Sequence, residues 1–171
     1  LHQACSIMLG VLLSLVELIR SGVTTFADMY SNMDAVAQAT LKAGLRANLT
    51  RGLVFGGPED LVKLDEGRKF YHDWNGTGDG RIQVDVGPHS VYMIPPEYMP
   101  KVVELARELD TRIHVHLSEN RKEIADSIKN HGTTPIAYAR DHGLFECKTY
   151  AAHCVHITDE DIRIMQENGV S

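Results

Sequence analysis

The sequence has no cluster of basic residues. Its 17 lysines and arginines are outnumbered by 23 acidic residues, and the formal net charge is -6. Nucleic acids and anionic membrane surfaces bind concentrated positive charge, so we expect neither as a partner. A long apolar run is missing too. Residues 7–19 are interrupted by Gly10, Ser14 and Glu17 and fall short of the roughly 20 apolar residues that a bilayer span needs.

Cysteine is scarce, and the three residues Cys5, Cys147 and Cys154 have no paired spacing. An odd number of cysteines without a visible signal peptide argues against a secreted disulfide framework and favours a reducing compartment. We therefore expect a cytoplasmic protein. A hydrophobic content of 43% in 171 residues suffices for one domain with a packed core.

Strand-like and helix-like patterns alternate regularly along the chain. Start and stop signals accompany them, with Ser31 or Asn32 as the expected cap of the second helix, Gly44 as its end and Thr158 as the cap of the last helix. The expected strands are 23–30, 45–54, 81–90, 112–120 and 149–157. The six expected helices are 1–20, 34–42, 58–74 with Pro58 in its first turn, 95–110, 121–142 as one or two segments, and 159–168.

This alternation predicts an α/β fold with a parallel sheet covered by helices. A doubly wound sheet gathers its chemistry at one switch point, whereas a TIM-type barrel carries it on the carboxyl ends of many strands. Polar residues end four successive strands here, and no glycine-rich phosphate loop follows the first strand. The sequence therefore predicts a partial TIM-type (β/α)8 barrel of about five βα units, a single segment over residues 1–171 that is truncated at both ends.

The stretch HVHLSEN, residues 114–120, is the first candidate site. His114 and His116 share one face of a strand, where neutral imidazole is a common ligand of zinc. Glu119 lies just beyond the strand, where a carboxylate can act as a proton shuttle. The alternative is that His114 packs in the barrel wall while Glu119 is solvated or caps the next helix.

A second pair of histidines ends the last strand. His153 and His156 are three residues apart, so a regular strand would point them to opposite faces. His153 is the better catalytic candidate because the small Ala151 and Ala152 precede it, and His156 is expected in the loop. Cys154 could be a nucleophile, but a buried cysteine is usually an inert small hydrophobe.

Two further residues end strands at the expected mouth of the barrel. His89, after Gly87 and Pro88, points into the mouth or merely caps a loop. Arg51 could bind a carboxylate or a polar substrate tail, or pair with a neighbouring loop acid.

Five stretches of the chain, in this order and spacing, carry a family resemblance. They are LIRSGVTTFADMY, GLRANLTRGL, DVGPHSVY, IHVHLSEN and YAAHCVHI, and they extend over essentially the whole chain. Together they resemble the amidohydrolase superfamily of metal-dependent barrel hydrolases, in particular its 5-methylthioadenosine and S-adenosylhomocysteine deaminases and the related chlorohydrolases. The resemblance places the chain on the second to sixth strands of the barrel.

The resemblance implies a role for each candidate residue. In this family a mononuclear site holds zinc, or another divalent metal such as iron, and His116 matches its ligand on the fifth strand. Glu119 matches the residue that moves a proton between the attacking water and the ring nitrogen of the substrate, and His153 matches the one that orients the attacking hydroxide. His89 matches a histidine that contacts the substrate, and Arg51 an arginine that meets its ribose or amino-acid tail.

The resemblance also marks departures from the family pattern. The histidine pair of the first strand and the aspartate of the eighth would lie outside this chain, which leaves the ligand set incomplete and predicts that the chain alone is inactive or nearly so. The position of a second family arginine falls near Lys63. This difference weakens the prediction that the protein binds the ribose or amino-acid tail of the substrate. His114 becomes a neighbour of the ligand.

The implied activity is hydrolytic deamination of an aminated purine nucleoside derivative, with a small molecule as substrate. A triazine-type chlorohydrolase and a guanine-type deaminase are the alternatives within the family. From another class, a non-catalytic half-barrel would pair its open sheet edges with another copy, giving a homo-oligomer.

Overall fold

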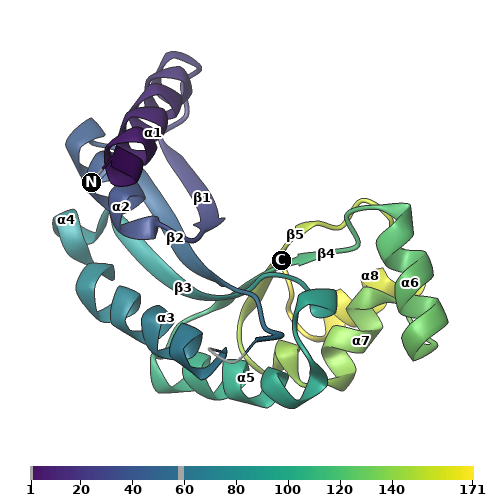
Figure 1. Ribbon diagram of the computed structural model, residues 1–171. Coiled ribbons are helices and arrows are strands. Elements are labelled where there is room, and N and C mark those ends of the chain that lie inside the picture. Colours follow the sequence, from purple (N-terminus) through teal and green to yellow (C-terminus); the bar gives the residue numbers. More distant parts are fainter. Residues whose placement is uncertain (1, 58–59) are drawn as a thin grey trace.

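One parallel sheet organises the chain. The computed structural model describes residues 2–57 and 60–171, and within them five strands form a single sheet in the order of the sequence. Every neighbouring pair of strands is parallel. The sheet curls into half of a barrel with helices between its strands (Figure 1), as predicted. The strands are β1 (Thr25–Tyr30), β2 (Arg46–Leu53), β3 (Ile82–Pro88), β4 (Ile113–Leu117) and β5 (Thr149–His153).

The described residues contain more helices than the six expected. The segment 121–142 forms two helices, because Gly132 ends the first in the left-handed conformation and Pro135 opens the second. The segment 95–110 begins with a 3-10 turn, and the expected first turn at Pro58 lies outside the described residues. The α-helices are α1 (His2–Arg20), α2 (Met33–Ala43), α3 (Asp60–Trp74), α4 (Thr77–Gly80), α5 (Met99–Glu108), α6 (Arg121–His131), α7 (Pro135–Asp141) and α8 (Asp159–Glu167); the 3-10 turns are η1 (Val91–Met93), η2 (Pro96–Tyr98) and η3 (Leu144–Glu146).

Two of the three predicted helix boundary residues act as expected. Gly44 ends α2 with a φ of 77°, and its N–H donates to the carbonyl of Leu41. Thr158 precedes α8 and accepts a hydrogen bond from the N–H of Asp161. Asn32 precedes α2, but its side chain makes no capping bond. Its ψ of 56° departs from the extended backbone of a capping residue, so this part of the prediction is wrong.

The strands β4 and β5 end earlier than their sequence patterns predict. β4 stops at Leu117 because the next residue, Ser118, has a φ of 53°. β5 stops at His153, whose φ is 72°, and Cys154 follows with a φ of 47°. Left-handed backbone cannot continue a strand and is rare for residues other than glycine. Both strands therefore bend sharply at their carboxyl ends.

Alternation along β4 separates an apolar outer face from a polar inner face. Ile113, Val115 and Leu117 are fully buried in the main hydrophobic core, together with residues of α5 and α7. Because successive side chains of a strand point to opposite faces, His114 and His116 lie on the inner side of the curled sheet. The candidate residues of this strand thus face the barrel interior.

The hydrogen-bonded ladder is thinnest between β3 and β4, and we call this place the seam. The two strands share one register pair, Val86 with Ile113, and an isolated bridge between Ser90 and His116. By contrast, the ladder between β2 and β3 runs from Ala47 to Leu53. The seam divides the half of the molecule that carries β1 to β3 from the half that carries β4 and β5 (Figure 1).

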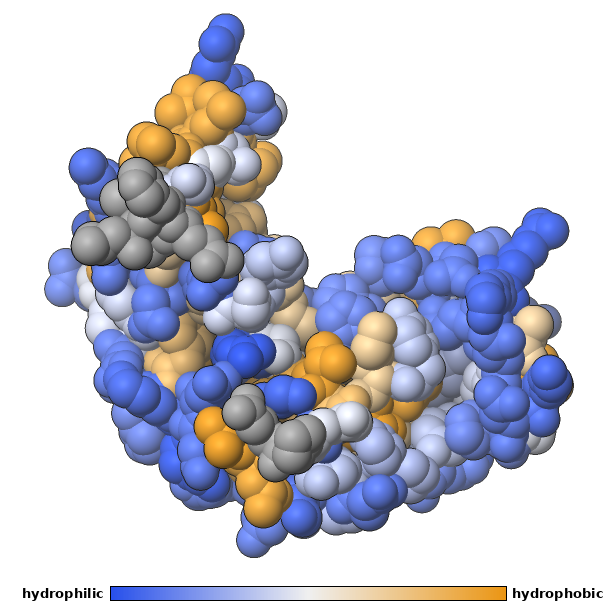
Figure 2. All heavy atoms as spheres, in the orientation of Figure 1, coloured by the Kyte–Doolittle hydropathy of each residue, from blue (hydrophilic) through white to orange (hydrophobic). Residues whose placement is uncertain are grey.

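Helix α1 carries a row of exposed apolar side chains. Leu9, Leu13, Val16 and Ile19 follow a helical spacing and are all exposed. Figure 2 shows hydrophobic atoms over this helix, and a hollow between it and the other half of the molecule. Within the part of the chain that the structure describes, no helix combines the length and the apolarity needed to cross a bilayer.

Candidate active site at the carboxyl ends of the strands

Four of the predicted site residues lie together at the carboxyl ends of β3, β4 and β5. The ring centroids of His89 and His116 are 4.9 Å apart, and those of His116 and His153 are 5.3 Å apart. Nε2 of His153 lies 3.8 Å from Oε1 of Glu119. We call these four residues the mouth cluster. Burial lowers the pKa of His89, and the proximity of His116 lowers it further.

A hydrogen bond determines which nitrogen of His116 carries the proton. Its Nδ1 lies 2.8 Å from the carbonyl oxygen of His89. A carbonyl oxygen only accepts, so Nδ1 carries a hydrogen, and in the neutral form of the ring Nε2 has a free lone pair. Metal-binding histidines use this arrangement, in which the second ring nitrogen donates to a carbonyl or carboxylate.

The described residues therefore offer one suitable donor for a metal ion, the Nε2 of His116. Among the described residues, no three side chains of histidine, cysteine, aspartate or glutamate form a group that could hold an ion. His116 has the chemistry and the tautomer of a metal ligand, but it alone does not make the donor set of a zinc site.

The bend at the end of β5 brings His153 into the mouth cluster. The register pairs His153 with Leu117, whose side chain lies in the core on the outer face. Regular alternation would send the imidazole the same way. With a φ of 72° the backbone leaves the strand conformation, and the ring lies against His116 instead. His156 lies in the following loop, where its N–H donates to the carbonyl of Ser118.

His114 is a wall residue. It is 5% exposed, stacks on Tyr150 with a centroid distance of 4.3 Å, and places Nδ1 3.4 Å from Oγ1 of Thr50. Burial lowers its pKa to about 4, with a smaller effect of the nearby His116, so the ring is neutral near pH 7. Of the two histidines in HVHLSEN, the structure thus leaves only His116 at the mouth.

Below the mouth lies a polar network around the buried Asp85 that the sequence did not predict. Nδ2 of Asn48 donates to Oδ2 of Asp85 at 2.5 Å and to the hydroxyl of Tyr150 at 3.0 Å. Arg112 pairs with Asp85 at 3.1 Å. Burial raises the pKa of Tyr150, and the Asp85 charge raises it further. We call these four residues the interior network. An aspartate inside the apolar stretch IQVDVGP was the available signal, because a buried carboxylate needs partners.

Glu119 has a fixed backbone and a half-exposed side chain. Its N–H donates to Oε2 of Glu123 at 2.8 Å, while its side chain is 49% exposed. The cap of α6 is Asn120, whose side chain accepts from the N–H of Glu123. Of the two alternatives for Glu119, capping of the next helix is therefore wrong, whereas the exposure of 49% agrees with a solvated side chain.

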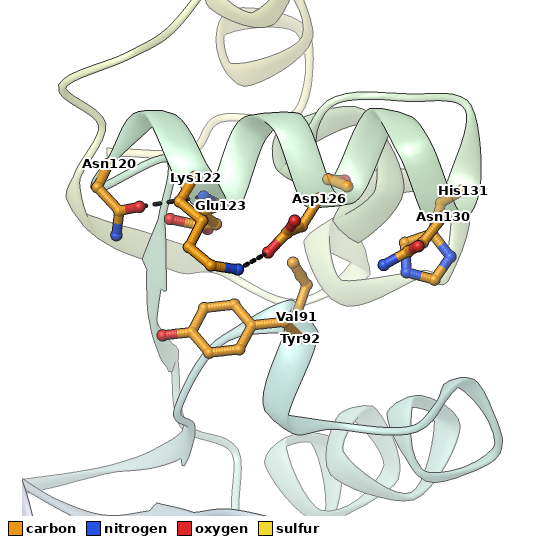
Figure 3. A pocket seen from close by; sticks show the side chains of 9 residues that line it. Val91, Tyr92, Asn120, Lys122, Glu123, Asp126, Asn130 and His131 are labelled. Atoms are coloured by element: carbon orange, nitrogen blue, oxygen red, sulfur yellow. Dashed lines mark hydrogen bonds and ion pairs between the residues drawn. The ribbon is translucent and has the colours of Figure 1, made fainter.

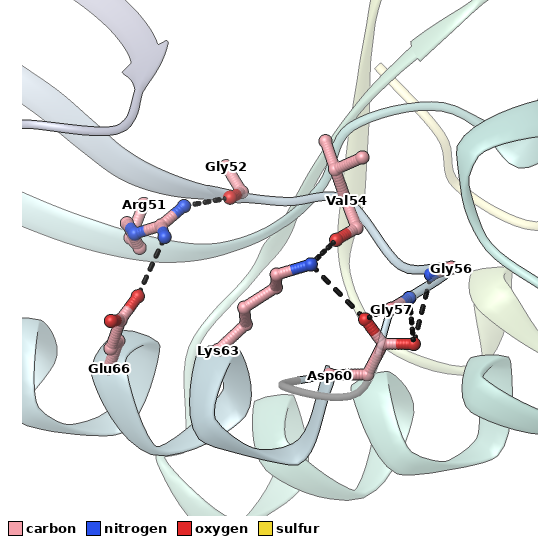
Figure 4. A network of polar contacts seen from close by, with 8 residues as sticks. All are labelled: Arg51, Gly52, Val54, Gly56, Gly57, Asp60, Lys63 and Glu66. Atoms are coloured by element: carbon pink, nitrogen blue, oxygen red, sulfur yellow. Dashed lines mark hydrogen bonds and ion pairs between the residues drawn. The ribbon is translucent and has the colours of Figure 1, made fainter.

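Arg51 lies apart from the mouth cluster but borders the same side of the molecule. Its guanidinium binds Oε2 of Glu66 at 2.6 Å and also donates to the carbonyl of Gly52 (Figure 4). The alternative for Arg51 predicted an acidic partner in a neighbouring loop. An acidic partner is present, but it lies on α3. Arg51, Lys63 and His89 line one pocket of about 430 Å³. Lys63 is itself held by the carbonyl of Val54 and by Asp60.

Cys154 is unsuited to act as a nucleophile. Burial raises the pKa of its thiol, and the charges of Glu123 and Asp161 raise it further. The thiolate is the reactive form, so this setting disfavours reaction. The structure supports the inert alternative.

A comparison with known protein families identifies the family of the chain. The model of the amidohydrolase family matches residues 6–171. The chain belongs to this family. The resemblance that the five sequence stretches carry is thereby confirmed.

Two relatives of this chain carry the same name. The chain is 48% identical over 164 residues to the 5-methylthioadenosine/S-adenosylhomocysteine deaminase of Thermoanaerobacter pseudethanolicus, and 44% identical to the enzyme of the same name from Caldanaerobacter subterraneus. Each match covers 95% of this chain and 38% of the relative, so the chain spans well under half the length of these amidohydrolases.

Solved structures share the fold. An adenosine deaminase from Xanthomonas campestris with bound zinc superimposes with a TM-score of 0.85 and 25% identity, over 96% of this chain and 38% of that one. An atrazine chlorohydrolase from Arthrobacter aurescens complexed with zinc gives a TM-score of 0.86 at 21% identity, over 98% and 42% of the two chains. The predicted barrel fold is confirmed by these matches.

Proposed function

We propose that the whole protein is a hydrolytic deaminase of a purine nucleoside with a sulfur-containing tail, such as 5-methylthioadenosine or S-adenosylhomocysteine. The observation that carries the proposal is the mouth cluster, in which an imidazole with a free Nε2 lies beside a second imidazole and a half-exposed carboxylate. The names of the relatives at 48% and 44% identity support the substrate class.

His116 would hold a divalent metal through Nε2, and the zinc in related structures makes zinc the first choice. When bound, such an ion supplies the Lewis acidity that makes water a nucleophile near neutral pH. His116 contributes one of the donors that such a site needs, so we propose that the other donors belong to further strands of the whole protein.

Glu119 and His153 would handle the protons. The Glu119 carboxylate takes a proton from the attacking water and delivers it to the ring nitrogen of the purine. His153, whose Nε2 lies 3.8 Å from this carboxylate, holds the water in line for attack on the carbon that bears the amino group. After water adds to this carbon, the carboxylate moves the remaining hydroxyl proton to the amino nitrogen. The bond between the carbon and this amino nitrogen then breaks, and the products are ammonia and the oxo-purine.

The pocket beside the mouth cluster would receive the rest of the substrate. His89 belongs both to the cluster and to this pocket, so it can contact the nucleoside between its reacting ring and its tail. Arg51 and Lys63 line the same pocket and would meet the ribose or the amino-acid carboxylate. Part of the Arg51 charge is balanced by Glu66, which favours a polar tail as well as a charged one.

Ammonia release by the whole protein tests the proposal. We expect release from 5-methylthioadenosine and S-adenosylhomocysteine, and a fall of kcat by about 10²- to 10⁴-fold in Glu119→Gln, which removes the base and keeps the size. The melting temperature should stay unchanged, because the Glu119 side chain is 49% exposed. Equal release by wild type and variant would exclude the proton-transfer role, and chloride release from a triazine without ammonia would favour the chlorohydrolase alternative.

Location and assembly belong to the same proposal. We infer a cytoplasmic protein from the odd number of cysteines and their lack of paired spacing in the sequence. Cys147 and Cys154 are free thiols in the structure. The sequence leaves the oligomeric state open, and size-exclusion chromatography with light scattering on the whole protein would test for a homo-oligomer.

A further inference from the structure

The carboxylate of Glu123 is buried and turned toward the mouth cluster. Glu123 is 9% exposed, although it belongs to the first turn of α6. Its Oε1 accepts from the N–H of Ser118 at 3.0 Å and its Oε2 from the N–H of Glu119 at 2.8 Å. Figure 3 shows Asn120 and Glu123 at the start of α6, where Lys122 pairs with Asp126 further along the helix. Glu123 thus binds the end of the preceding strand.

The corresponding acid of α8 does something different. Asp161 also lies three residues after the cap of its helix and is 1% exposed. Its carboxylate returns to the N–H of the cap residue Thr158 at 2.9 Å, which is an ordinary capping box. Glu123 reaches past its own cap, Asn120, to the two preceding N–H groups. One of these belongs to the proposed proton carrier.

The backbone of Ser118 connects the loops that follow β4 and β5 in the mouth cluster. While its N–H binds Glu123, its carbonyl accepts from the N–H groups of Val155 and His156 at 3.1 and 3.0 Å. The loop after β5, which follows His153, is thereby tied to the loop that carries Glu119. Ser118 has a φ of 53°, and such a conformation persists only where surrounding contacts hold it. Glu123 provides such a contact.

We propose that Glu123 is a positioning residue of the deaminase, whose carboxylate holds the N–H groups of Ser118 and Glu119 and so presents the Glu119 side chain to His153. The inference rests on the proposed function and deepens it. Glu123 touches no substrate in this assignment and acts only through the backbone of the mouth cluster.

Glu123→Gln tests the inference in the whole protein. A glutamine has one acceptor oxygen, so one of the two N–H groups would face a donor. Because a displacement of about 1 Å can lower a rate by about 10²-fold, we expect a loss of kcat of about that size. KM should stay unchanged, since the pocket of Arg51 and His89 is untouched. Glu123→Asp keeps both acceptors on a shorter side chain and should restore part of kcat.

Two variants separate positioning from stability. Asp161→Asn removes a buried acid from the same helix position and should lower the melting temperature while kcat is kept. Asp126→Asn breaks an exposed pair on α6 and should change neither. Hydrogen–deuterium exchange gives a readout besides activity. Peptides covering residues 117–120 and 154–156 should exchange faster in Glu123→Gln than in Asp161→Asn.

The outcomes distinguish this inference from the proposed function. If the wild-type protein releases no ammonia, the proposed function fails, and the exchange experiment still tests the tie between Glu123 and the strand end. If kcat of Glu123→Gln equals that of the wild type, or falls no further than in an equally destabilised Asp161→Asn, the positioning role is overturned. Unchanged exchange at residues 117–120 would overturn it as well.

Discussion

The interior network and the mouth cluster lie on the same inner face of the sheet, yet they treat polar groups in opposite ways. Asn48, Asp85 and Tyr150 sit in regular strands and bind one another. His153 and Glu119 belong to strand ends and are 39% and 49% exposed at their side chains. Buried polar groups require partners, whereas a group that reacts must keep a free lone pair or an exchangeable proton. Polar residues within the strands thus bind one another, whereas the more exposed polar residues, which we propose to be reactive, lie at the carboxyl ends of the strands.

Replacing His116 by phenylalanine should damage the mouth cluster most. The substitution keeps a ring of similar shape and removes Nε2. Groups that merely orient a metal-binding histidine are worth about 10–100-fold, so we expect the ligand itself to account for more than about 10²-fold in deaminase rate. Metal content by elemental analysis should fall together with the rate.

His114→Phe is the matched control for this comparison. The ring of His114 is buried and neutral near pH 7, because burial lowers its pKa to about 4, and phenylalanine can keep the stack on Tyr150. We expect the metal content of the wild type. A loss of metal as complete as in His116→Phe would contradict the different roles of the two histidines.

Asp85→Asn should damage the interior network and spare the chemistry. The variant keeps the shape but removes the charge that Arg112 and Asn48 bind. Hydrogen bonds to charged groups are worth about 1.5–3 kcal/mol, and Arg112 is partly exposed, so we expect a loss of about 2 kcal/mol in the free energy of unfolding. Urea denaturation measures this loss. A parallel fall in kcat would show that the interior network also affects the mouth cluster.

Cys154→Ala should have the smallest effect. The thiol packs beside the main core and burial raises its pKa, so the thiolate forms only at a higher pH than in an unfolded chain. We expect a stability change within about 1 kcal/mol and an unchanged deaminase rate. In the wild type, alkylation of Cys154 near pH 8 should be slow and should accelerate on unfolding. Loss of activity on substitution would revive the nucleophile interpretation.

The sequence was sufficient for the order of the elements and for the residues at the strand ends. Apolar alternation and helix boundary signals such as Gly44 and Thr158 are local, and the fold follows from their succession. The position of His89 and His116 at neighbouring strand ends followed from the same succession. The substrate role of Arg51 stays a prediction, and its partner Glu66, which is distant in sequence, could not be predicted.

The features of the site that the sequence did not predict depend on backbone conformation and on long-range contacts. Left-handed conformations at Ser118 and His153 have no sequence signal, because these residue types usually avoid them. Regular alternation would even have turned His153 away from the site. Glu123 looks like an ordinary first-turn acid, and only its contacts with residues 118 and 119 reveal its reach past the helix cap.

The seam between β3 and β4 has a chemical consequence through one atom. The carbonyl oxygen of His89 accepts the backbone N–H of His116 at 2.9 Å and its Nδ1–H at 2.8 Å. The last rung that joins the two halves of the sheet and the bond that orients the imidazole therefore share a single acceptor. Any separation of the strands at this rung would also free the ring to rotate about its side-chain torsions. The orientation of the His116 imidazole is thus coupled to the pairing of β3 with β4.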